Sequence, residues 1–96
     1  SALRSEAMLT QRAQWPHTVS DITKALDGVW GLCGAHGLNG NLYRLERSLH
    51  EPIVYTFTEY RGEDESDIVK REEYSLEDRQ IAVDQFAKAL GFGQSN

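Results

Sequence analysis

The spacing of apolar residues predicts two helices in the first third of the chain. Residues 3–14 are good helix formers. Pro16 ends the helix predicted there, because the residue before a proline avoids helical backbone angles. Residues 18–29 carry apolar side chains at intervals of three and four, which is the spacing of one helical face. Thr18 and Asp21 resemble a capping box at the start of this second helix.

The second half of the chain changes from a period of two to helical spacing. Residues 52–60 alternate between two sets of β-branched, aromatic and polar side chains, which predicts a strand. Residues 61–67 form a polar turn and residues 68–74 a weaker strand, so the two strands are expected to make an antiparallel hairpin with a flexible acidic tip. Residues 76–91 then form the clearest amphipathic helix, with Gly91 as its stop.

The middle of the chain is ambiguous. Residues 27–41 contain five glycines, which excludes one long helix and leaves either an ordered loop or a short strand over residues 29–33. Leucines recur at intervals of four, three and four within residues 38–50, a pattern that favours a helix. The same residues also fit a strand, but less well, because Arg47 interrupts the apolar face.

With a helix at residues 38–50, the order of elements resembles a winged helix-turn-helix. Residues 18–26 (TVSDITKAL) correspond to the second helix, residues 40–49 (GNLYRLERSL) to the recognition helix and residues 53–74 to the wing. The run REEYSL at residues 71–76 resembles most closely the end of PadR-like regulator domains. The resemblance implies a single α+β domain over residues 1–96 that contacts DNA through helix 41–49.

With a strand in the middle, the architecture is different. Residues 29–49 then form a hairpin that turns at Asn39 and Gly40. The protein becomes a helix, a four-stranded antiparallel meander and a final helix. This small α+β arrangement is typical of a compact protein that binds another protein.

Charge is distributed unevenly along the 96 residues. The net charge is −5, and residues 59–73 hold seven acids against three bases. Such a protein does not bind phosphate through its overall charge, so any affinity for DNA needs a local basic face. No apolar run approaches the roughly 20 residues of a membrane helix. Cys33 is the only cysteine, which excludes an intrachain disulfide and favours the cytoplasm.

Two binding hypotheses follow, and we weigh them nearly evenly. In the first, a small regulatory protein reads DNA, with a homodimer supplying the second half-site. Its dimer interface would be the last helix, through Val83, Phe86 and Leu90. Its candidate DNA contacts are Asn39, Asn41, Arg44, Arg47, Lys70 and Arg71.

In the second hypothesis, the acidic hairpin covers a basic surface on another protein, as inhibitors, immunity proteins and nucleic-acid mimics do. The candidate partner contacts lie within residues 59–73. They are Glu59, Tyr60, Glu63, Asp64, Glu65, Asp67, Glu72 and Glu73.

Neither catalysis nor a cofactor is expected from the sequence. Cys33 and His36 have C-x-x-H spacing, which supplies at most half of a tetrahedral zinc site. No set of base, nucleophile and stabilising group can be assembled from the remaining residues. We therefore expect a binding module without metal or cofactor.

Overall fold

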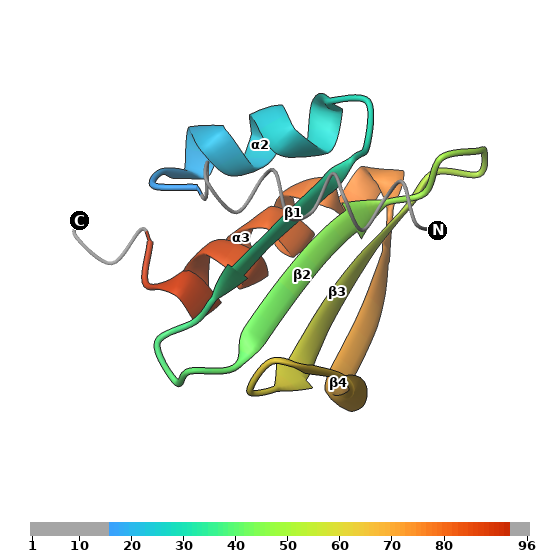
Figure 1. Ribbon diagram of the computed structural model, residues 1–96. Helices are drawn as coiled ribbons and strands as arrows, with labels where there is room; N and C mark the ends of the chain where they lie inside the picture. Colours follow the sequence, from blue (N-terminus) through green and yellow to red (C-terminus); the bar gives the residue numbers. More distant parts are fainter. Residues whose placement is uncertain (1–15, 93–96) are drawn as a thin grey trace.

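The computed structural model describes residues 16–92, so the helix predicted at residues 3–14 lies outside the described part (Figure 1). Two helices and four strands make up this part, with one 3-10 turn before the last helix. In chain order they are α2 (Val19–Asp27), β1 (Leu32–His36), β2 (Leu42–Arg47), β3 (Val54–Arg61), β4 (Asp64–Ser75), the 3-10 turn η1 (Leu76–Asp78) and α3 (Arg79–Leu90).

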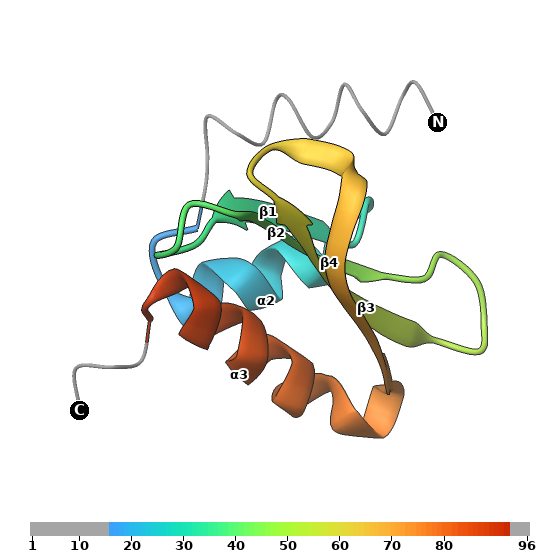
Figure 2. The ribbon, with the colours of Figure 1, turned by 90° about the horizontal axis from the view of Figure 1, so that it is seen from below.

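The strands form one antiparallel sheet in the order β1-β2-β3-β4, so each strand pairs with its neighbour in sequence. Helices α2 and α3 lie side by side on the same face of this sheet (Figures 1 and 2). The α+β class is confirmed. The order of helix, four-stranded meander and helix is that of the second architecture considered from the sequence.

The capping box at the start of α2 is confirmed. The Thr18 hydroxyl accepts the Asp21 N–H at 3.2 Å, and the Asp21 carboxylate accepts the N–H groups of His17 at 2.9 Å and Thr18 at 3.2 Å. These bonds hold the pKa of Asp21 below its ordinary value, with the His17 N–H as the largest cause. Because three otherwise free groups at the helix start are satisfied, α2 begins sharply at Val19.

The helix predicted within residues 38–50, and with it the recognition helix 41–49, is wrong: this stretch contains strand β2. Leu42 and Leu45 project from opposite faces of the strand, yet both are fully buried. A strand buried on both faces does not alternate between apolar and polar residues, which explains why the leucine spacing imitated a helix. Arg47 lies on the helix side of β2, and its guanidinium caps the carboxyl end of α2.

The hairpin predicted in the second half of the chain is confirmed as β3 and β4. The acidic run does not form the expected flexible tip. Strand β4 already starts at Asp64, so most of these acids lie in the strand, and the turn is limited to Gly62 and Glu63. Gly62 has φ +58°, a left-handed conformation that glycine adopts readily. Helix α3 is also confirmed and ends at Gly91, with φ +89°.

The core lies between the sheet and the two helices. Phe57 on β3 stacks on Tyr43 with ring centroids 5.7 Å apart, and its ring meets that of Phe86 edge-on at 6.3 Å. The predicted dimer seam is wrong at Val83 and Phe86, which are fully buried in this core, and Leu90 packs against it. Amphipathicity of α3 therefore reflects the fold, where burial of each large apolar side chain contributes roughly 1.5–3 kcal/mol. None of the described helices is long and apolar enough to cross a membrane.

Candidate interaction surfaces

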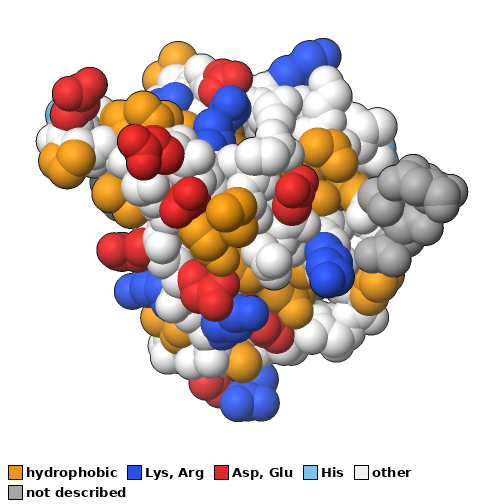
Figure 3. All heavy atoms as spheres, turned by 180° about the vertical axis from the view of Figure 1, so that it is seen from behind, with side chains coloured by type: hydrophobic (Ala, Val, Ile, Leu, Met, Phe, Trp, Pro, Cys, Tyr) orange, Lys and Arg blue, Asp and Glu red, His pale blue; other side chains and the backbone are white. Residues whose placement is uncertain are grey.

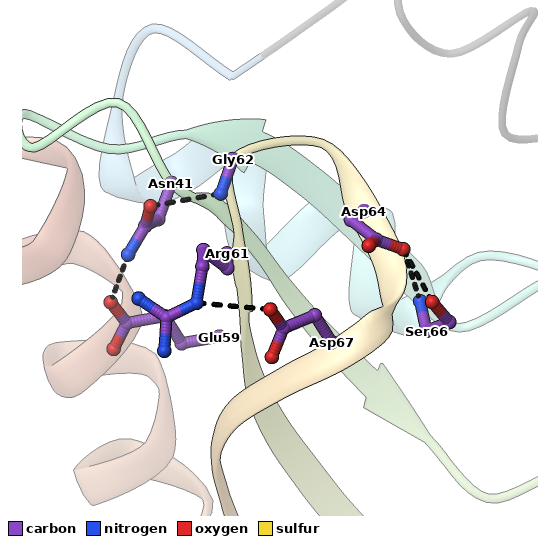
Figure 4. A network of polar contacts seen from close by, with 7 residues as sticks. All are labelled: Asn41, Glu59, Arg61, Gly62, Asp64, Ser66 and Asp67. Carbon is purple, nitrogen blue, oxygen red and sulfur yellow. Dashed lines mark hydrogen bonds and ion pairs between the residues drawn. The ribbon is translucent and has the colours of Figure 1, made fainter.

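A polar network ties together two turns at one end of the sheet (Figure 4). The Asn41 side chain donates to Glu59 at 2.7 Å and accepts the Gly62 N–H at 3.0 Å. The backbone adds a bond from the Leu42 N–H to the Gly62 carbonyl at 2.8 Å. The turn between β1 and β2 is thereby fastened to the turn between β3 and β4.

Glu59 is the centre of this network. It also receives a bond from Asn39 at 3.3 Å and one from the Tyr43 hydroxyl. Together these donors, with Asn41 the largest cause and Lys70 adding an attractive charge, hold the pKa of Glu59 below its ordinary value. The carboxylate is fixed, and its acceptor capacity is largely used within the protein.

The acids of the hairpin turn have neighbours of their own. The Nε of Arg61 donates to Asp67 at 2.9 Å. Asp64 accepts the N–H and the hydroxyl of Ser66 at 2.9 and 2.6 Å, which lowers the pKa of Asp64 (Figure 4). These contacts hold the first residues of β4 to one another and to Arg61 at the end of β3.

On the outer face of the sheet, Arg44 pairs with Glu65 and lies over the ring of Tyr60, 5.2 Å from its centroid. Tyr60 is only 4% exposed, so its predicted place on a partner-binding surface is wrong. The His36 Nε2 lies 3.4 Å from a Glu63 oxygen. We call Asn39, Asn41, Glu59 and residues 61–67 the hairpin end. Its acids are engaged within the chain.

Further along β4, on the helix side of the sheet, Glu72 is held in the same way. It accepts the Tyr74 hydroxyl at 2.7 Å, a bond that raises the pKa of Tyr74 to about 12. Lys70 lies 4.0 Å from Glu72 and over the ring of Phe57. Of the acids predicted to meet a partner, Glu73 is the one whose side chain makes no hydrogen bond or ion pair with the residues that the structure describes.

The residues predicted to contact DNA are also engaged, with one exception. Arg47 donates to the carbonyls of Leu26 at 2.7 Å and Gly28 at 3.2 Å, and Gly31, where a Cβ would lie 3.0 Å from the guanidinium, leaves room for it. Asn39, Asn41, Arg44 and Lys70 make the contacts given above. Arg71 is exposed and has no partner within residues 16–92.

The opposite end of the sheet differs. The Val54–Ser75 pair places the loop between β2 and β3 beside η1, and the Ser48 hydroxyl closes this loop by accepting the Val54 N–H at 3.0 Å. Four acids near this end make no hydrogen bond or ion pair through their side chains within the described residues. They are Glu51, Glu73, Glu77 and Asp78.

Exposed apolar side chains occur among these acids. Leu49, Leu76 and Ile81 are 51%, 56% and 50% exposed. Figure 3 views the helix side of the molecule, where acidic, basic and hydrophobic side chains lie interspersed. The nearest base on α3, Arg79, is held by Asp27 at 2.8 Å and lies over the ring of Tyr55. We call Leu49, Glu51, Glu73, Ile81 and η1 the acidic end.

Sequence reasoning missed most of the acidic end because it followed the density of acids along the chain. Glu77 and Asp78 lie in the first turn of the helix predicted at residues 76–91, where the helix dipole favours acids, so their sequence context does not point to a partner. The signal that could have found this surface is the pair of large apolar residues outside the predicted periodic patterns, Leu76 and Ile81.

Cys33 is a core residue, 3% exposed, and burial raises the pKa of its thiol to about 12. A buried thiol of this kind remains protonated and is a poor nucleophile or metal ligand. Within residues 16–92 no group of three His, Cys, Asp or Glu side chains is placed to hold a metal ion.

Comparison with protein-family models, with curated proteins and with solved structures finds no match to this chain.

Proposed function

We propose that this protein is a non-enzymatic binding module whose acidic end engages a basic, partly apolar surface on another protein. The observation that carries the proposal is the coincidence, in one region, of acids without partners and exposed leucine and isoleucine side chains. Single exposed apolar residues are common on protein surfaces. Here they lie at the same end of the sheet as four carboxylates whose side chains make no hydrogen bond or ion pair within the described residues.

Free carboxylates suit a basic partner for a physical reason. An acid already paired within its own chain must lose that pair before it can bind, whereas an unpaired acid gives up only water. Complementary charge raises the rate of association and selects the partner, while the apolar side chains supply area that leaves water. The acidic end offers both.

The DNA hypothesis has less support. It relies on a helix at residues 41–49, where the structure has strand β2. Five of its six candidate residues have partners inside the protein. We therefore develop the protein-binding hypothesis.

The proposal is tested with a probe of the expected chemistry, an amphipathic peptide of about 14 residues made of lysine and leucine. Titration into the ¹⁵N-labelled protein at low salt should shift the backbone amides of residues 49–51 and 73–81. The variant Glu77→Lys should weaken binding roughly fivefold or more, because it turns a free acid into a repelling base.

The matched control is Glu63→Lys, which changes the net charge by the same amount at the hairpin end. It should leave the affinity within about twofold, since only the long-range field changes. Equal losses for the two variants would show that the peptide responds to net charge alone and would contradict the proposal. Shifts centred on residues 59–67 would contradict it as well. A mixed-sequence DNA duplex should produce no shifts.

A further inference from the structure

Strand β4 forms one border of the sheet, and no described strand pairs with its other side (Figure 1). Within residues 68–75 only Glu72 and Tyr74 are half-buried, and the others are exposed. An uncovered edge strand presents a row of unpaired N–H and C=O groups to other strands. The opposite border, β1, is short, and its residues are buried or half-buried. Strand β4 is therefore the edge at which a further strand can add.

The register of the sheet shows which residues of β4 have free backbone groups. The Ser48 N–H donates to the Val54 carbonyl at 2.8 Å, so Val54 directs its backbone groups toward β2. Because neighbouring residues in a strand alternate, residues 55, 57 and 59 direct theirs toward β4. Their partners on β4 are residues 74, 72 and 70. The N–H and C=O groups of Arg71 and Glu73, which lie between these, point away from the sheet.

Arg71 and Glu73 also carry the unused charges of this edge. Both side chains lie on the outer face of the sheet, because they alternate with Glu72 on the helix side. Neither side chain makes a hydrogen bond or ion pair within residues 16–92. The free edge therefore holds one base and one acid, two residues apart on the same face, and both lack a partner in the described part of the chain.

We propose that β4 pairs antiparallel with β4 of a second copy of this chain, with Glu72 on the two-fold axis. This register places Arg71 opposite Glu73 of the partner subunit, and Glu73 opposite the partner's Arg71. Opposite charges that face each other across a strand pair stabilise it. The same residues bring their free backbone groups together, so that each pair exchanges both N–H···O bonds. One continuous sheet results, with all helices on one side.

The charges select this register over its neighbours. A two-fold axis at Arg71 would set two arginines opposite each other, and an axis at Glu73 would set two glutamates opposite each other. Like charges directly opposite destabilise a strand pair. In the proposed register Glu72 meets its own counterpart, but each Glu72 already accepts the Tyr74 hydroxyl and has Lys70 4.0 Å away.

Exposed apolar residues lie where the paired segment would end. Ile68 and Val69 are each 43% exposed, and Leu76 is 56% exposed. In the proposed register Ile68 of one chain stands opposite Leu76 of the partner subunit, and the two-fold axis repeats this contact at the other end. Burial of these side chains adds a hydrophobic contribution to the pairing. The paired segment stops there because β4 ends at Ser75 and η1 begins.

This junction shares Glu73 and Leu76 with the acidic end but does not depend on the function proposed for it. Glu51, Glu77 and Asp78 lie outside the paired segment and stay available for a basic partner. One strand on each side makes a small interface, so we expect a dimer with a Kd of about 100 µM. The protein is then a monomer at micromolar concentrations.

Sedimentation equilibrium of the full chain, from about 10 µM to about 1 mM, should show a monomer–dimer equilibrium. Salt of about 150 mM screens the repulsion between two chains of net charge −5. In ¹⁵N-labelled samples, the amide hydrogens of Arg71 and Glu73 should exchange with solvent more slowly as the protein concentration rises. A monomer at every concentration would overturn the proposal, as would a dimer whose amide shifts centre on α3.

Charge reversal tests the register. Arg71→Glu and Glu73→Arg should each weaken the dimer roughly tenfold or more, because each sets like charges opposite one another. Glu73→Arg reduces the net negative charge of the chain, so overall repulsion cannot explain its loss. An equimolar mixture of the two variants should associate again as a heterodimer, in which every opposed pair has opposite charges.

The matched control is Lys24→Glu on α2, which changes the net charge by the same amount as Arg71→Glu. It should leave the Kd within about twofold, since only the screened long-range field changes. Equal losses for Lys24→Glu and Arg71→Glu would show that dimer formation depends on net charge and would overturn the proposal. A mixture of Arg71→Glu and Glu73→Arg that stays monomeric would overturn the register.

Discussion

The two ends of the sheet hold the same kinds of residues in opposite states. At the hairpin end, Glu65 pairs with Arg44, Asp67 with Arg61, and Glu59 accepts the Asn41 amide. At the acidic end, acids of equal charge stand unpaired beside exposed leucines. A count of acidic residues along the chain favours the hairpin end as the surface that binds a partner. Pairing in three dimensions reverses that ranking, since a paired acid maintains the fold while a free acid remains available for a partner.

The largest expected effect concerns the packing that supports the hairpin end. Gly37→Ala should lower the free energy of unfolding by about 2–3 kcal/mol, because the new Cβ meets the Tyr43 ring and a backbone oxygen. Gly28→Ala is the matched control, since its Cβ would meet nothing closer than 3.4 Å. Urea unfolding should show little change for Gly28→Ala, and a similar loss for both would contradict this explanation.

Next in size is the loss of the side chain that joins the two turns. Asn41→Ala should cost about 2 kcal/mol, because it leaves the Gly62 N–H without its acceptor and removes the 2.7 Å bond to the Glu59 carboxylate. Asn39→Ala should cost less, about 1 kcal/mol, because its bonds to Glu59 and from the Asn41 N–H are exposed and the Tyr43 hydroxyl, to which it also donates, keeps Glu59 as a partner. Equal costs in thermal unfolding would show that Asn41 is not the main link.

The pH dependence of stability gives a third test. Because the pKa of Glu59 is lower in the folded protein, the unfolded chain takes up the proton first as the pH falls. The contribution of Glu59 is therefore complete above its ordinary value of 4.5 and is lost as the pH falls through the folded pKa.

This loss is measured as the difference in free energy of unfolding between the wild type and Glu59→Gln, from about pH 6 to pH 3. The difference should be constant above pH 4.5 and decrease below it. Taking the difference removes the contributions of Asp21 and Asp64, whose pKa values are also lowered. A difference that does not change with pH would refute the stabilising role of the ionised form.

The smallest effect comes from the same substitution, glutamate to glutamine, made once at each end of the sheet. Glu65→Gln should cost about 1 kcal/mol, since Arg44 is only 19% exposed and its Nε is already buried without a hydrogen bond. Glu73→Gln should change stability by less than about 0.5 kcal/mol, because Glu73 has no partner to lose. Chemical unfolding of both variants side by side decides whether the ends differ as described.

Local signals were sufficient for part of this fold. The capping residues Thr18 and Asp21 predict the start of α2, and the alternation in residues 52–60 predicts β3, because both depend on neighbours in the sequence. Strand β2 was not predictable in the same way. Arg47 looked like a break in its apolar face because its partners, the last carbonyls of α2, lie about 20 residues earlier.

The candidate surfaces were less predictable still. Arg44 and Glu65 are 21 residues apart and Asn41 and Glu59 are 18 apart. Which acids find a base therefore depends on the register of the sheet, and a single-residue shift would move each side chain to the other face. Sequence reasoning identified the acidic residues but not the ones that remain free.

The order of strands in the sheet has a consequence for how the protein is made. Because each strand pairs with the one before it, the sheet can assemble while the chain leaves the ribosome, and each step closes only a short loop. Helix α2 covers only part of the apolar face of that sheet, and the rest stays open until α3 brings Val83 and Phe86 to it. Nascent chains that end before residue 79 should therefore be the most exposed to chaperones and to aggregation.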